Sequence, residues 1–134
     1  MIEVIVSAAI GQEPYETKVQ ARQHTITTDE PLSLGGKDKG MNPFELLAAS
    51  LATCTAATLK MYIDRKKWAV GGIRVEVKIN YNKAESFTNF DRKISFEDAL
   101  LTEEALESLY GIANRCPVHK LLEGQVGITT VIQK

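Results

Sequence analysis

Apolar and polar residues alternate in several stretches of the chain, and each stretch predicts a strand. The alternation from Ile2 to Ala8 and the longer one from Ile73 to Tyr81 are typical of strands that bury one face. Short strands are also expected between Tyr15 and Thr28 and from Val126 to Ile132.

The strand from Ile73 to Tyr81 is expected to pair with the segment that follows it. Residues 82–89 are a polar connection, and Arg92 to Glu97 forms the antiparallel return. The alternation places Ile94 and Phe96 on the inward face of this return strand.

The strongest helix signal follows a loop. Residues 29–40 contain one proline and three glycines and predict that loop. Residues 42–45 are Asn-Pro-Phe-Glu, which combines a favoured N-cap, a proline at the first helical position and a capping-box glutamate. The helix is expected to end near Lys67. Its first half, to Ala57, is apolar or small on every side, the pattern of a helix buried all round.

Two shorter helices are expected in the last third of the chain. The first begins after Thr102, with acidic residues at its positive end. Cys116-Pro117 interrupts it, and a short helix over 117–123 is closed by Gly124. The buried stripe of the first of these helices is expected to consist of Leu106, Leu109, Tyr110 and Ala113.

The order of these elements predicts a single α+β domain over residues 1–134, in which a mostly antiparallel sheet packs around the long buried central helix. One sheet covers only one side of a helix, whereas this helix is apolar all round. A second copy of the chain would supply the missing cover, so the pattern predicts a homodimer.

Composition narrows the class of protein. The 134 residues are 44% apolar and 25% charged, which fits one globular domain with its own core. The net charge of −1 is dispersed, which argues against binding to nucleic acid or to an anionic membrane. The uncharged stretch 46–59 is too short to span a bilayer, and the N-terminus lacks a signal-peptide pattern. We therefore expect a cytoplasmic protein whose two cysteines are free or redox-active.

The two cysteines have different settings. Cys54 lies inside the long helix, where it is either a small core residue or a reactive thiol. Cys116 precedes Pro117 at a helix N-terminus, where backbone N–H groups favour a thiolate. The alternative for Cys116 is a plain N-cap. Their spacing excludes a CxxC motif.

Other polar residues carry weaker signals. Cys116 and His119 have the spacing of half a zinc site that Cys54 and His24 would complete, but the second half lacks short local spacing, so we expect neither metal nor cofactor. Arg22 is either a solvated cation or a site residue. Glu45 is fully accounted for by the capping box.

Several motifs resemble the OsmC/Ohr family, the osmotically inducible protein C and organic hydroperoxide resistance proteins, and its OsmC-like branch in particular. The resemblance covers nearly the whole chain in order. The residues that carry it are Asn42 to Thr55, Cys116-Pro117-Val118-His119-Lys120, Asp29-Glu30-Pro31, Gly35-Gly36 and Lys60-Met61-Tyr62.

The resemblance implies an intertwined homodimer that acts as a thiol peroxidase in oxidative stress defence. Cys54 would attack a hydroperoxide and become a sulfenic acid, and Cys116 would resolve it to a disulfide. A thiol or dithiol reductant would reset the pair. Arg22 matches the family's activating arginine, which a nearby carboxylate holds, and apolar surroundings would favour organic peroxides.

One position departs from the family pattern. A glutamate follows the proline in well-studied members, whereas this chain has Phe44 there and Glu45 one residue later. One residue rotates a helical side chain by about 100°. Glu45 is therefore either a catalytic carboxylate or only a helix cap. The alternative function is a non-catalytic dimeric protein of the same fold that binds a small molecule.

Overall fold

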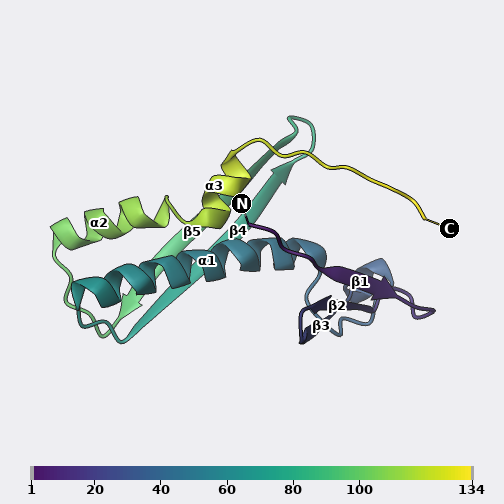
Figure 1. Cartoon of the computed structure of the whole chain (residues 1–134), viewed down its shortest axis with the longest axis horizontal. Coiled ribbons are helices and arrows are strands. Elements are labelled where there is room, and N and C mark those ends of the chain that lie inside the picture. Colours follow the sequence, from purple (N-terminus) through teal and green to yellow (C-terminus); the bar gives the residue numbers. More distant parts are fainter. Residues whose placement is uncertain (1, 134) are drawn as a thin grey trace. The chain divides into compact units, whose positions relative to one another are not determined.

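The structure is a computed structural model that describes residues 2–133. The chain forms two compact units, Met1–Leu47 and Ala48–Lys134, and helix α1 crosses their boundary (Figure 1). Antiparallel sheets and three α-helices confirm the α+β class; the single domain stays a prediction. The elements are β1 (Ser7–Ile10), β2 (Thr17–Ala21), β3 (His24–Thr28), a 3-10 turn (Leu32–Leu34), α1 (Pro43–Lys66), β4 (Gly72–Asn82), β5 (Phe87–Glu97), α2 (Glu103–Ala113) and α3 (Pro117–Glu123).

The N-terminal unit is built on an antiparallel sheet in the order β1-β2-β3. The β2–β3 connection is a two-residue turn, because Ala21 pairs with His24. Arg22 begins this turn with a left-handed backbone, φ 56°, which few non-glycine residues adopt.

The glycine-rich loop after β3 is organised around the buried carboxylate of Asp29. Its oxygens accept the backbone N–H groups of Glu30, Lys37 and Lys39 at 2.8, 3.3 and 3.2 Å. Burial opposes ionisation of Asp29, but these donors lower its pKa. A Cβ atom at Gly36 would collide with the carbonyl oxygen of Glu30, so the loop requires glycine there.

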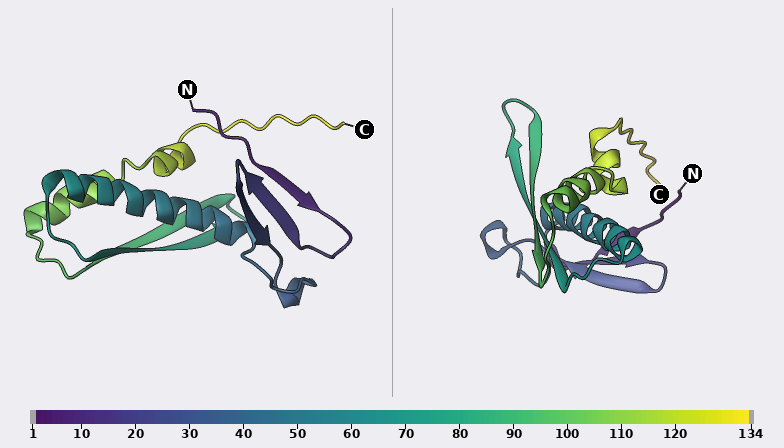
Figure 2. Two further views of the ribbon diagram at one scale, coloured as in Figure 1. Left: turned by 60° about the horizontal axis from the view of Figure 1, so that its bottom comes forward. Right: turned by 90° about the vertical axis from the view of Figure 1, so that its left-hand side faces the viewer.

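The C-terminal unit has its core where α1 and α2 pack on the β4–β5 hairpin. Figures 1 and 2 show both helices on the same face of this hairpin. Leu59 and Ile63 of α1 meet Leu109 and Ala113 of α2, and the inward residues of both strands complete the cluster. The hairpin keeps the predicted alternation along its paired strands.

Within one chain, α1 buries a single stripe rather than its whole surface. The buried residues are Leu51, Thr55, Leu59 and Ile63, spaced four apart. The other faces of α1 are half-buried or exposed, so the second copy that the sequence predicts stays a prediction. By length and composition α1 is long and apolar enough to cross a membrane, a test that the core helix of a soluble protein also passes.

Four expectations from the sequence are wrong in detail. The return strand is Phe87–Glu97 rather than 92–97, so the polar connection is 83–86 and not 82–89. The first strand is Ser7–Ile10, not 2–8, because β2 pairs only with those residues. The last strand over 126–132 is absent from the described chain, where no neighbouring backbone pairs with it. In α2 the buried stripe is Ala105, Leu109 and Ala113, whereas Leu106 and Tyr110 are exposed.

The predicted capping box of α1 is confirmed and gives the first testable prediction. Glu45 accepts the backbone N–H of Asn42 at 2.9 Å, and Asn42 accepts that of Glu45 at 2.8 Å. We expect Asn42→Ala to lower the free energy of unfolding by about 1 kcal/mol, because it removes the N-cap acceptor. Glu45→Gln should leave it unchanged, since glutamine also serves at this position. Urea unfolding of the three proteins measures both; equal losses in the two variants would contradict the capping role.

Candidate functional site

Cys116 is the N-cap of α3, as its position before Pro117 predicts. Its sulfur accepts the backbone N–H of His119 at 3.4 Å, and the side chain is fully buried. Proline at the first helical position lacks an N–H group and so leaves no donor unsatisfied there. The cap therefore places a sulfur atom, rather than the usual oxygen, against the positive end of a helix.

The second cysteine lies beside the first. Cys54 is half-buried on α1 and lies close enough to Cys116 for its side chain to help lower the pKa of the Cys116 thiol. Both thiols are free. The fold therefore brings together two cysteines from distant parts of the sequence, as the predicted disulfide requires.

Thr55, the residue next to Cys54, joins the thiols to the rest of the unit. Its hydroxyl donates to the carbonyl oxygen of Leu51 at 2.7 Å and lies 3.7 Å from the sulfur of Cys116. It also accepts a hydrogen bond from Nη1 of Arg92 at 3.0 Å. The hydroxyl is completely buried, and every polar function it has is used.

These contacts change the acidity of Cys116. Burial of the sulfur by itself raises the pKa of the Cys116 thiol. The hydrogen bond that the backbone N–H of His119 donates, then the contacts with the side chains of Thr55 and Cys54, act in the opposite direction. The positive charge of Arg92 adds to them, and the net result is a lowered pKa. Cys116 is thus a thiol that its surroundings hold toward the thiolate form.

Both ring nitrogens of His119 contact other side chains. Its Nδ1 lies 2.9 Å from Nη2 of Arg92, and its Nε2 lies 3.0 Å from a carboxylate oxygen of Glu123. A zinc site would need one of these nitrogens as a metal ligand. Within residues 2–133, no group of three or more potential metal ligands forms.

An open cavity lies next to Arg92. It has a volume of about 590 Å³, and its walls are mainly apolar. They include Leu51, Phe87, Phe90, Ile94 and Leu122, with Arg92, Asn114 and His119 as polar members. A side pocket of this kind can receive an apolar molecule beside a cation.

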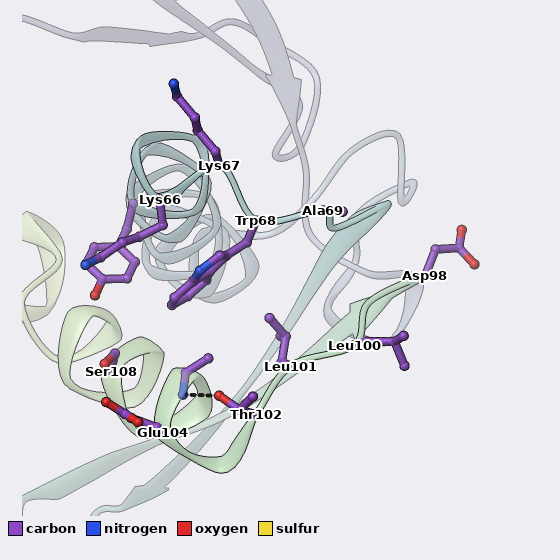
Figure 3. A pocket seen from close by; sticks show the side chains of 12 residues that line it. Lys66, Lys67, Trp68, Ala69, Asp98, Leu100, Leu101, Thr102, Glu104 and Ser108 are labelled. Carbon is purple, nitrogen blue, oxygen red and sulfur yellow. Dashed lines mark hydrogen bonds between the residues drawn. The ribbon is translucent and has the colours of Figure 1, made fainter.

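A second cavity, of about 630 Å³, lies where α1 ends and α2 begins (Figure 3). Trp68 and Leu101 line it together with Lys66. The hydroxyl of Thr102 accepts the Ala105 N–H at its floor and serves as the N-cap of α2. No cysteine lines either cavity, but the cavity beside Arg92 includes Leu51 and Arg92, which both contact Thr55, the neighbour of Cys54, whereas this cavity includes neither.

The residues predicted for the site belong to two different units. Cys54 and Cys116 meet in the C-terminal unit, whereas Arg22 and Glu45 belong to the N-terminal unit. Arg22 is exposed at its turn, and Glu45 is occupied by the capping box. Sequence reasoning missed Arg92, although its place on the inward face of the return strand, in phase with Ile94 and Phe96, was an available signal.

The fold and the thiols define an α+β protein with a pair of neighbouring cysteines, one half-buried within a helix and one buried at the N-terminus of another. The OsmC-like protein family matches residues 36–131, and the chain belongs to this family. A comparison with curated proteins finds no match.

Solved structures share the fold. A protein from Psychrobacter arcticus has 22% identity and a TM-score of 0.76, covering 90% of this chain and 89% of the other. An OsmC-like protein from Mycoplasma pneumoniae has 20% identity and a TM-score of 0.73, with 92% and 89% covered. An organic hydroperoxide resistance protein of Bacillus subtilis has 19% identity and a TM-score of 0.61, with 92% of each chain covered.

The lowered pKa of Cys116 predicts how stability depends on pH. A thiol whose pKa is lower in the folded state stabilises the fold above the pKa of the unfolded chain, and this contribution is lost as pH falls through the folded pKa. The difference in free energy of unfolding between the native protein and Cys116→Ser should therefore grow as pH rises. Urea unfolding with reductant present, over a pH series, measures it; a difference that is constant with pH would contradict the lowered pKa.

Proposed function

We propose that the protein is a thiol peroxidase that reduces organic hydroperoxides, with Cys54 and Cys116 as its catalytic cysteines. The contact between the two thiols, beneath the N-terminus of α3, is the observation that carries the proposal. Membership of a family whose structural neighbours include organic hydroperoxide resistance proteins supports it. We propose a cytoplasmic role in oxidative stress defence.

The burial of the two sulfurs supports the roles that we propose for them. Cys54 is half-buried and can meet a peroxide, whereas Cys116 is fully enclosed. The Cys116 thiolate can take the proton of the adjacent Cys54 thiol, which leaves a Cys54 thiolate for attack.

The reaction then proceeds in two balanced steps. The Cys54 thiolate attacks one peroxide oxygen and the O–O bond breaks, so that Cys54 becomes a sulfenic acid and the alkoxide takes the proton held by Cys116 and leaves as an alcohol. The Cys116 thiolate then attacks the Cys54 sulfur, the S–O bond breaks, and the hydroxide takes a proton from solvent to form water as the disulfide closes. A thiol or dithiol reductant supplies the two electrons that restore both thiols.

The cavity beside Arg92 supports an organic rather than a small polar peroxide. Binding of a hydrocarbon group against its apolar walls would remove apolar surface from water, which favours binding. The polar side chains of the cavity can face the peroxide oxygens. The second substrate is the reductant, and neither cofactor nor metal has a part in this scheme.

A homodimer completes the proposal. The two chain ends bear exposed apolar residues, such as Ile2, Val4, Ile128 and Ile132. Their alternating pattern is that of strands, and the described chain offers them no partner backbone. A second copy could provide both this pairing and the cover for α1, and sedimentation at micromolar concentration distinguishes the dimer from a monomer.

One observation favours the alternative, a non-catalytic binding protein of the same fold. Phe44 replaces the family's glutamate, and the carboxylate of Glu45 is engaged in a helix cap. If Glu45 is nevertheless catalytic, Glu45→Gln should reduce the peroxidase rate at unchanged thermal stability. We expect this variant to keep its rate.

Peroxide titration tests the enzymatic proposal. We expect one equivalent of cumene hydroperoxide to remove both free thiols of the reduced protein and to link Cys54 to Cys116 within one chain, as mass spectrometry would show. In Cys116→Ser, a sulfenic-acid probe should label Cys54, because no thiol remains to resolve it. Cys54→Ser is the matched control and should consume no peroxide. Two thiols that persist in excess peroxide would leave the binding protein as the better proposal.

Arg22 is proposed as the cation that activates Cys54, on the family resemblance and on its constrained position in the turn. Arg22→Ala should slow thiol oxidation by about tenfold or more, the loss expected for one charge-assisted hydrogen bond. Arg22→Lys should recover part of the rate, and Thr25→Ala, an exposed change in the neighbouring strand β3, should leave the rate unchanged. Stopped-flow measurement of peroxide consumption compares them; an unaltered rate in Arg22→Ala would assign activation to another cation.

A further inference from the structure

Arg92 occupies a position where a strand normally places an apolar residue. It lies opposite Val77 in the β4–β5 register and shares its face with Ile94 and Phe96. It is half-buried there. A guanidinium removed from water needs hydrogen-bond partners, and these partners reveal what the residue does.

Every contact that the structure gives to Arg92 leads to the thiol site. Nη1 donates to the hydroxyl of Thr55 at 3.0 Å. Nη2 donates to the amide oxygen of Asn114 at 3.0 Å and faces Nδ1 of His119 at 2.9 Å. Asn114 lies two residues before Cys116, and His119 three residues after it. The guanidinium therefore bridges α1 to the chain on both sides of the cysteine.

The contact with Arg92 indicates which nitrogen of a neutral His119 ring carries the proton. Arginine has donors only, so Nδ1 must accept and carries no proton. The proton of the neutral ring is then on Nε2, which lies 3.0 Å from the Glu123 carboxylate and donates to it. Glu123 thus orients the ring, and the ring orients the guanidinium, in the way that outer partners orient a catalytic histidine.

The partners of Arg92 are neutral, and this leaves its charge available. Among residues 2–133, no carboxylate makes an ion pair with Arg92; Glu123 acts only through the ring of His119. A carboxylate in direct contact would neutralise the guanidinium. Asn114 and His119 fix its position without doing so, and the positive field remains directed at the sulfur of Cys116.

We propose that Arg92 is the cation that holds Cys116 as a thiolate, and that His119 and Glu123 are positioning residues that keep Arg92 against Thr55. Arg92 acts in two ways. Its charge attracts the thiolate directly, and its hydrogen bond to the Thr55 hydroxyl, which lies 3.7 Å from the sulfur of Cys116, fixes the guanidinium beside that sulfur. This role of Arg92 rests on the proposed peroxidase function, which gives the thiolate its purpose. The role itself concerns only the protein in its reduced state, before peroxide reacts.

The test is a titration of the Cys116 thiolate by its ultraviolet absorbance, in a Cys54→Ser background so that one thiol is followed. Arg92→Gln should raise the pKa of Cys116 by about one unit, a tenfold smaller thiolate fraction at a fixed pH well below that pKa. The matched control is Lys93→Gln, which removes the same charge from the next residue of β5, on its exposed face. This control should titrate like the parent.

Two further pairs of variants separate positioning from simple packing. His119→Phe removes both ring nitrogens and should raise the pKa of Cys116, whereas His119→Asn keeps an acceptor for Arg92 and should restore most of the difference. Glu123→Ala should cause a smaller rise, and Glu123→Gln, which can still accept from Nε2, should cause none. Glu123 is largely exposed, so neither change affects the core.

The outcomes are distinct. Equal titration of Arg92→Gln and Lys93→Gln overturns the proposal. If Arg92→Gln does not unfold cooperatively, the histidine pair decides, and equal titration of His119→Phe and His119→Asn overturns the proposal in the same way. Peroxide consumption is measured separately with Cys54 restored. If the pKa of Cys116 changes as expected in the variants but the thiols do not react with peroxide, the peroxidase function is refuted and the role of Arg92 stands.

Discussion

A single buried hydroxyl, that of Thr55, holds the thiol site together. It connects the backbone of α1, the guanidinium from β5 and the sulfur that caps α3. Three elements meet at this one oxygen atom, in a place from which water is excluded. Because an unpaired polar group is costly there, the contacts support one another, and loss of any one leaves the others imperfectly satisfied.

Local signals in the sequence predicted most of the secondary structure. The caps of α1, α2 and α3 lie where the capping residues place them, since a cap depends on a few neighbouring residues only. The central hairpin follows its alternation for the same reason. The terminal segments were predicted less well, because an alternating segment becomes a strand only when another backbone pairs with it. Sequence pattern cannot show whether that partner exists.

The candidate site was predictable in its cysteines but not in its cation. Periodicity marked α1 and the α3 cap, and family resemblance joined Cys54 to Cys116, which the fold then brought into contact. Arg92 is one of 16 basic residues, and most of these are solvated. Only the alternation of β5 distinguishes Arg92, because it places this charged residue on the same face of the strand as Ile94 and Phe96. Its link to His119 depends on how a strand and a short helix pack, which local patterns do not encode.

The separation of the two cysteines along the chain has a mechanical consequence. A bond between their sulfurs would close a loop that contains the second half of α1, the whole β4–β5 hairpin and α2. Closing a loop of about 60 residues removes roughly 4 kcal/mol of conformational freedom from the unfolded chain. Oxidation would therefore lock the core of the C-terminal unit, and reduction would release it. The redox state of the pair would therefore change how well this unit resists heat and proteases, whether or not the protein turns over peroxide.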